Sequence, residues 1–318
     1  LTTMNSMGYA IDKSGMCHGI ATSLLIRSIV DGDDFEKNHL NLIKYMQNPT
    51  KIKENKLYWD LRAFFDEIVL FQSSNITQLI PPSDKDSQKE YHKNFKGVIK
   101  QQNGPLLANF TGKNVFLNKS EQHLILVDTN DVKKTKNIIK NNLLNGKKMM
   151  LAVDRHTMSL FPIDQTNRKV CFIDHDNIYS DDVDLLLDYV LKRSNTKKLE
   201  KFAISIHVYE NGQPNYVYED KFDHADLESQ VKSNFIKLAF QTGHTEAIKA
   251  FVNRVLASKL DDADKKELLL AKDAADYPSI RMAFQNGHAE AIKAFVDGVL
   301  ASDLDDAVKK ELLLAKDA

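Results

Sequence analysis

The sequence predicts an α+β domain over residues 1–222, followed by an all-α repeat domain over residues 223–318. Three observations lead to this prediction. Near the C-terminus, a stretch of sequence returns almost unchanged after 44 residues. Before it, helical periodicity gives way to short runs of alternating apolar and polar residues, which are typical of strands. The chain has 318 residues, enough for two domains that each bury a core.

The repeat is the most specific feature of the sequence. Residues 240–274 return as residues 284–318 with 29 of 35 positions identical, so the segment is a tandem duplication. Within each copy the apolar residues recur at helical spacing, and Gly243 and Gly287 stand where a helix should end. Since such a unit cannot bury its apolar face alone, we expect neighbouring units and a chain cut from a longer array.

The segment from Pro278 to Ile292 resembles an ankyrin repeat, in which a first helix led by proline ends in Gly-His. The departure is length, because ankyrin repeats have about 33 residues and 44 leave room for an extra helix or a long connection. The resemblance implies that this part of the chain recognises a protein partner. We expect His244 and His288 to bond backbone carbonyls of the neighbouring repeat rather than a metal ion.

The first 222 residues read as one helical lobe followed by an antiparallel sheet. Apolar residues at helical spacing predict helices over residues 15–31, 35–47 and 55–73. A turn-rich segment over residues 81–87 separates them from the sheet. The other predicted elements are strands over residues 123–127, 150–162, 169–174 and 202–208 and helices over residues 180–193 and 261–271.

The composition is that of a globular protein. With 43 basic and 44 acidic residues, the chain gives no electrostatic reason to expect nucleic acid or an acidic membrane surface as a partner. No apolar run approaches the roughly 18–20 residues that span a bilayer, and no secretory signal peptide opens the chain. Two cysteines predict reduced thiols rather than a disulfide framework or a four-thiolate zinc site. Zinc-protease, phosphate-loop and dinucleotide motifs are absent from the sequence, so we expect neither a metal nor a cofactor.

Cys17 stands at the predicted first turn of a helix, with Ser14 as its N-cap. A thiol at this place faces the positive end of the helix dipole and free backbone N–H groups, which both stabilise a thiolate. Gly15 and Gly19 flank it, and we expect these small residues to let a substrate chain pass close by. The alternative is a buried structural cysteine on an amphipathic helix.

A histidine and an aspartate on the predicted hairpin can complete a catalytic group. His156 lies on an alternating strand and Asp174 ends the next one, so a turn centred near Thr166 places residue 158 opposite Asp174. His156 and Asp174 then share one face of the ladder as near-diagonal neighbours. In this arrangement a carboxylate orients a general base, which takes the proton of the nucleophile.

These pieces resemble the YopT-type cysteine peptidases, which are papain-like effectors that bacterial pathogens inject into host cells. The resemblance lies in a Gly-x-Cys-x-Gly-Ile word that opens a helix, a histidine on a strand, and Phe-Ile-Asp at the end of the next strand. Together with the repeats, this arrangement resembles the EspL-like architecture, in which ankyrin-type repeats follow such a domain. It implies that Cys17 is the nucleophile, His156 the general base and Asp174 the orienting acid.

The sequence departs from the family pattern in two places. The family usually reads Phe-x-Asp-Pro-Asn, whereas here Asp176 follows two residues after Asp174 and is a rival for the orienting carboxylate. Papain-like enzymes also place an amide side chain upstream of the nucleophile to hold the oxyanion, and here Asn5 is the candidate. His207, on the last predicted strand, is the reserve base.

The resemblance implies a papain-like cysteine-peptidase domain over residues 1–222 and ankyrin-like repeats over residues 223–318. We expect a cysteine protease without cofactor that is secreted into the host cytoplasm and cleaves a host protein recognised by the repeats. Two alternatives stay open. One is a non-catalytic scaffold that binds a host protein through its repeats. The other is a deamidase or transglutaminase-like acyl transferase, because these enzymes share the thioester chemistry.

Overall fold

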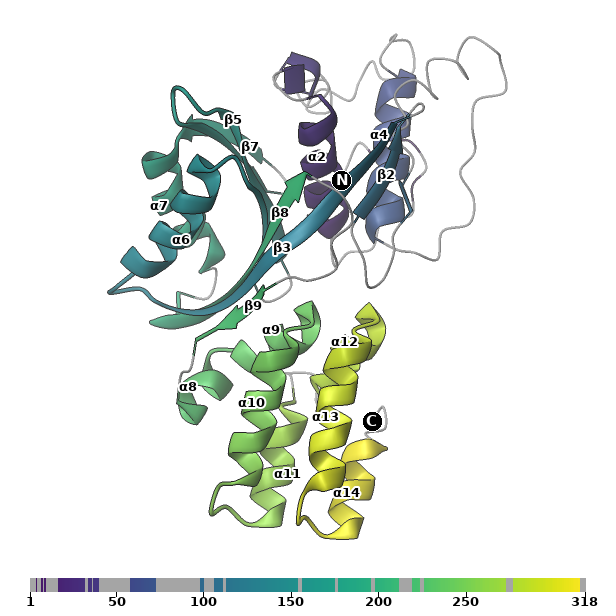
Figure 1. Ribbon diagram of the computed structural model, residues 1–318, viewed down its shortest axis with the longest axis vertical. Helices are drawn as coiled ribbons and strands as arrows, with labels where there is room; N and C mark the ends of the chain where they lie inside the picture. The colour runs from purple at the N-terminus through teal and green to yellow at the C-terminus, as the bar shows by residue number, and fades with distance from the viewer. Residues whose placement is uncertain are drawn as a thin grey trace.

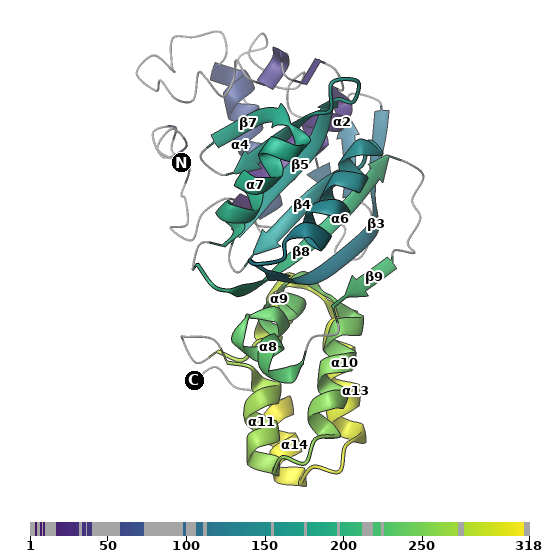
Figure 2. The same ribbon diagram turned by 90° about the vertical axis from the view of Figure 1, so that its left-hand side faces the viewer.

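In the computed structural model, one sheet carries helices on both faces (Figures 1 and 2). Nine strands make up this sheet within the described part of the chain. The described residues are 4, 7, 9, 17–31, 34, 35, 37–39, 58–72, 98–99, 106–110, 113–153, 156–174, 177–195, 198–211, 219–223, 226–272 and 277–314.

The sheet is mixed, with strand order β1-β2-β3-β8-β4-β5-β6-β7. Neighbours along this path pair antiparallel, whereas β9 pairs parallel with β3. The strands are β1 (Val98–Ile99), β2 (Leu106–Phe110), β3 (Lys113–Asp128), β4 (Lys148–Val153), β5 (His156–Asp164), β6 (Lys169–Asp174), β7 (Asn177–Asp182), β8 (Lys201–Asn211) and β9 (Glu219–Phe222).

Alternating side chains give the sheet two apolar faces. On β4, Leu151 and Val153 are buried on the face covered by α6 (Lys133–Leu144) and α7 (Val183–Ser194). Met150 lies between them in sequence and packs instead on the opposite face. Both faces are therefore covered, as Figure 2 shows for α6 and α7 in front of the strands.

The helices α2 (Cys17–Val30) and α4 (Tyr58–Gln72) cover part of the opposite face, with Phe161 of β5 in their core. A buried ion pair joins them, because Arg27 Nε and Nη2 each donate at 2.8 Å to a carboxylate oxygen of Glu67. Their side chains are only 4% and 2% exposed. This pair fixes α4 against α2, which packs directly on β4 and β5.

After α8, the last six helices of the described chain form two units of three, which Figure 1 shows stacked side by side at one end of the sheet. In their interface, Asn286 Nδ2 and His288 Nε2 each bond the carbonyl oxygen of Gln241, at 2.7 and 2.9 Å. The period of 44 residues thus corresponds to one helix more than the two of an ankyrin repeat. The helices are α8 (Leu227–Lys232), then α9 (Phe235–Thr242), α10 (Thr245–Leu256) and α11 (Asp262–Leu270) in the first unit, and α12 (Ile280–Asn286), α13 (Ala289–Ala301) and α14 (Asp306–Leu313) in the second.

The first unit is built directly onto the sheet. Leu124 of β3 and Ala203 of β8 belong to the same apolar cluster as the buried residues of α9 and α10. His244, just before α10, is fully buried, with Nδ1 2.7 Å from Asp220 Oδ1 and Nε2 2.8 Å from Ser205 Oγ. The expected bond to a carbonyl of the neighbouring repeat is confirmed for His288 and wrong for His244, because the neighbour of the first unit is the sheet.

These features contradict the predicted fold class. A papain-like α+β domain followed by an all-α ankyrin-like repeat domain does not describe the chain, since one mixed sheet carries helices on both faces and shares a core with the first helical unit. Hydrophobic periodicity shows which side of an element is buried but not which element covers it. The parallel pairing of β9 with β3 has no local sequence signal of its own.

Most predicted elements lie close to observed ones, but the helix predicted over residues 180–193 begins only at Val183, after β7, and α6, β1, β2 and β9 were not predicted. One further difference bears on the site. The strand predicted over residues 150–162 is two strands, since β4 ends at Val153 and β5 begins at His156 opposite it. The prediction joins the apolar run over residues 149–153 and the alternation from Met158 into one strand, although the polar residues 154–157 stand between them. Most of the helix predicted over residues 35–47 and the turn-rich segment over residues 81–87 lie outside the described residues.

Nearly identical sequences in the two helical units have different burial. Phe240 is fully buried, with its ring centroid 5.8 Å from that of Phe295. Its equivalent in the second unit, Phe284, is 60% exposed. We therefore expect Phe240→Leu to lower the free energy of unfolding by about 1 kcal/mol, and Phe284→Leu to change it by less than about 0.5 kcal/mol. Urea unfolding of both variants measures the difference, and equal effects would contradict the stacking of the units.

Candidate active site

Cys17 is the first residue of α2, as its sequence context predicts. The helix lies close to α4, where a Cβ atom on Gly19 would stand 2.1 Å from the carbonyl oxygen of Ile68. Gly19 is therefore required by helix packing, and the expectation that it makes room for a substrate chain is wrong. Cys17 is buried, with 9% of the residue exposed.

The hairpin places His156 and Asp174 on one face of the sheet. Ser159 pairs with Ile173 in β5 and β6, so residue 158 falls opposite Asp174 as the predicted turn requires. His156 Nε2 lies 2.6 Å from Asp174 Oδ1. The Asp174 side chain is fully buried, whereas the His156 side chain is 21% exposed, so the histidine connects a buried carboxylate to an accessible surface.

Cys17 completes the group through a hydrogen bond with His156. Burial alone lowers the pKa of His156. The hydrogen bonds with Asp174 and Cys17 and the charges of both groups outweigh burial and raise the pKa of His156 to about 9. The imidazole is therefore protonated at neutral pH, which favours a thiolate–imidazolium pair.

A further residue that the sequence analysis did not identify belongs to this group. Arg193, in the last turn of α7, donates through Nε to Asp174 Oδ2. Basic residues are common in the last turn of a helix because of the helix dipole, so Arg193 gave no distinct signal. Its contact with Asp174 arises only when α7 packs against the sheet.

The remaining predicted site residues divide into two groups. Asn5, the oxyanion candidate, and Asp176, the rival carboxylate, lie outside the described residues. His207, the reserve base, lies on β8 near the helical units, with its ring centroid 6.0 Å from that of His244. Cys171 is 2% exposed and packs in the core beneath α2 and α4.

The described residues contain neither a membrane-spanning helix nor a metal-binding cluster. No helix there combines the length and apolar character that crossing a bilayer requires. Nor do three His, Cys, Asp or Glu side chains gather anywhere in that part of the chain in a way that could hold a metal ion.

The arrangement of Cys17, His156 and Asp174 is that of a nucleophile, a base and an orienting acid. Its chemistry is inferred from these side chains and their contacts, and the resemblance to YopT-type peptidases stays a prediction. Comparisons with known proteins assign the chain to no family, since no family model, no curated protein and no solved structure matches it.

Proposed function

We propose that the chain is a thiol hydrolase that cleaves peptide bonds, with Cys17 as nucleophile, His156 as acid and base, and Asp174 as the acid that orients His156. The observation that carries this proposal is the continuous chain of hydrogen bonds from Cys17 through His156 to the buried Asp174. A structural cysteine or a half-buried histidine would need only one such partner. The complete set favours an enzyme over a non-catalytic scaffold.

The reaction proceeds in two halves. The Cys17 thiolate attacks the carbonyl carbon, and the C–N bond breaks as His156 gives its proton to the departing amine, which leaves a thioester on Cys17. Water then attacks the thioester while His156 accepts the proton of the water. The C–S bond breaks, the acid product leaves, and Cys17 and His156 return as the thiolate–imidazolium pair.

The backbone at the start of α2 supplies donors for the oxyanion. The first N–H groups of a helix have no acceptor within the helix, and they carry the positive end of its dipole. Cys17 is the first residue of α2, so the developing negative charge on the carbonyl oxygen forms close to these groups. An amide side chain can add a second donor.

The helical units would select the substrate. They lie at one end of the sheet in Figure 1, and their exposed apolar side chains include Phe284 and Leu300, which are 60% and 56% exposed. Exposed apolar side chains of this size are suited to protein contacts. A host protein as substrate, and delivery from a bacterial pathogen into the host cytoplasm, follow from the family resemblance alone.

The test is digestion of a diverse peptide library by wild type and Cys17→Ser, with the products identified by mass spectrometry. We expect cleavage by wild type, and none by Cys17→Ser at an unchanged midpoint of unfolding. Cleavage that persists in Cys17→Ser would contradict the assignment. Glutamine deamidation without chain cleavage by wild type would instead favour the acyl-transfer alternative.

A further inference from the structure

The Asp174 carboxylate is the most buried charged group of the site, and both of its oxygens are used. Oδ1 accepts from His156 Nε2 at 2.6 Å, and Oδ2 accepts from Arg193 Nε. The Asp174 side chain has no exposed surface. A carboxylate taken out of water is strongly disfavoured unless partners of good geometry surround it, so Asp174 depends on both neighbours.

Arg193 approaches Asp174 from a different element than His156 does. It stands in the last turn of α7, and Leu187 and Val190 of that helix are buried against the sheet. The position of Arg193 is thus set by the core. His156 begins β5, so the Asp174 carboxylate lies between a strand on one side and a helix on the other.

A carboxylate with one partner can rotate about its side-chain bonds. A second donor on the other oxygen removes this freedom, and the planar guanidinium group of arginine gives that donor a fixed direction. The geometry points to Arg193 as the positioning residue of the site, which holds Asp174 in the orientation that orders the His156 ring. This inference rests on the proposed function, in which Asp174 orients His156.

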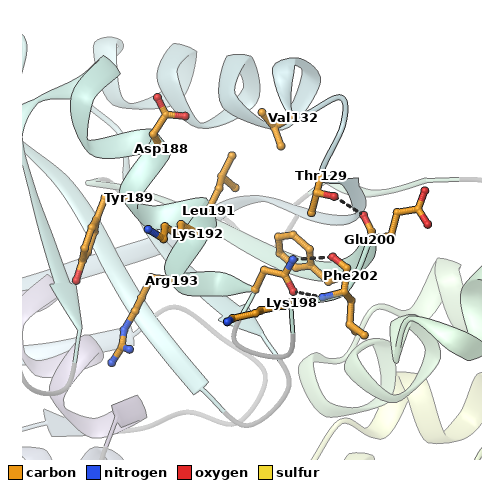
Figure 3. Close-up of a pocket in the computed structure, with 12 residues that line it drawn as sticks. Thr129, Val132, Asp188, Tyr189, Leu191, Lys192, Arg193, Lys198, Glu200 and Phe202 are labelled. Atoms are coloured by element: carbon orange, nitrogen blue, oxygen red, sulfur yellow. Dashed lines mark hydrogen bonds between the residues drawn. The ribbon is translucent and has the colours of Figure 1, made fainter.

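Solvent reaches the part of the Arg193 side chain that faces away from Asp174. Its side chain is 38% exposed and lines a surface hollow of about 970 Å³ at the end of α7, where Figure 3 shows it beside Lys192 and Tyr189. A small cation can therefore reach the position of the guanidinium group when the side chain is removed. This access makes chemical rescue possible.

The test compares wild type, Arg193→Ala and Arg168→Ala. Arg168 is a matched control, because it pairs with the exposed Asp184 and not with Asp174. In each chain, NMR titration gives the pKa of His156, and iodoacetamide labelling gives the rate at Cys17 near neutral pH. We expect Arg193→Ala to lower the pKa of His156 by about one unit and to slow labelling about tenfold. Guanidinium ions at low concentration restore both values, and sodium chloride at equal ionic strength restores neither.

Each other outcome overturns the inference. An unchanged pKa of His156 in Arg193→Ala means that Asp174 holds its orientation alone. A raised pKa means that Arg193 only offsets the charge of Asp174 and does not position it. If Arg193→Ala does not fold, Arg193→Gln keeps most of the side-chain stem and undergoes the same titration.

The wild-type titration separates failure of this inference from failure of the proposed function. A wild-type His156 that titrates near 6.5 contradicts the thiolate–imidazolium pair itself. A wild-type His156 near 9 that is unchanged in Arg193→Ala contradicts only the role of Arg193.

Discussion

Replacing His156 by alanine slows the alkylation of Cys17 by iodoacetamide about 10- to 100-fold near pH 6.5. In wild type, the pKa of His156 is raised to about 9, and the charged imidazole stabilises the Cys17 thiolate. Without that partner less of the thiol is ionised, and an ordinary cysteine is only about 1% thiolate at this pH. The lower limit allows for the weaker intrinsic nucleophilicity of a stabilised thiolate.

Two controls accompany this measurement. His207→Ala removes a strand histidine that lies near the helical units, and we expect it to leave the labelling rate unchanged. Cys171, which is 2% exposed, serves as an internal reference for a buried thiol in mass-spectrometric site assignment. Equal labelling of Cys17 in wild type and His156→Ala would show that the pair is not activated.

Replacing Glu67 by alanine lowers the free energy of unfolding by about 3–5 kcal/mol, because Arg27 is then buried without its partner. Both carboxylate oxygens of Glu67 accept from Arg27 at 2.8 Å, and a third bond comes from Ser23 Oγ at 3.1 Å. Urea unfolding followed by circular dichroism measures the loss. The pair also joins α2, which carries Cys17, to α4. In Glu67→Ala we therefore expect that a further His156→Ala substitution no longer slows the labelling of Cys17.

The matched control replaces both partners, as Arg27→Met with Glu67→Met. Apolar side chains of similar volume remove the two buried charges together, so we expect the double variant to recover most of the lost stability. A loss below about 1 kcal/mol in Glu67→Ala would show that water reaches Arg27 and that the pair is not buried in solution.

The sequence predicted the contacts of the candidate site better than it predicted the fold. A single hairpin register, read from the alternation around Thr166, was enough to place His156 beside Asp174. The helical periodicity over residues 15–31 was enough to place Cys17 in the first turn of a helix, whereas its predicted N-cap, Ser14, lies outside the described residues. Both inferences depend on local pairing and local periodicity, which short sequence segments specify.

The contacts that the sequence did not predict join elements that are distant along the chain. The Arg193–Asp174 bond requires α7 to cross the end of β6, and the Asp220–His244 bond requires β9 to lie beside the first helical unit. The same limit explains the wrong fold class. Many helices and strands were predicted one by one, but their packing on two faces of one sheet depends on contacts between their surfaces.

The buried bonds of His244 make the helical units hard to transplant. His244 has no exposed surface, and its two ring nitrogens lie within hydrogen-bond distance of Asp220 and Ser205, which belong to strands of the sheet. If these units were moved to another scaffold, His244 would lie at the new interface without Asp220 and Ser205, its two hydrogen-bond partners. The portable module is therefore larger than the duplicated sequence, and it includes the strand segments that carry Asp220 and Ser205.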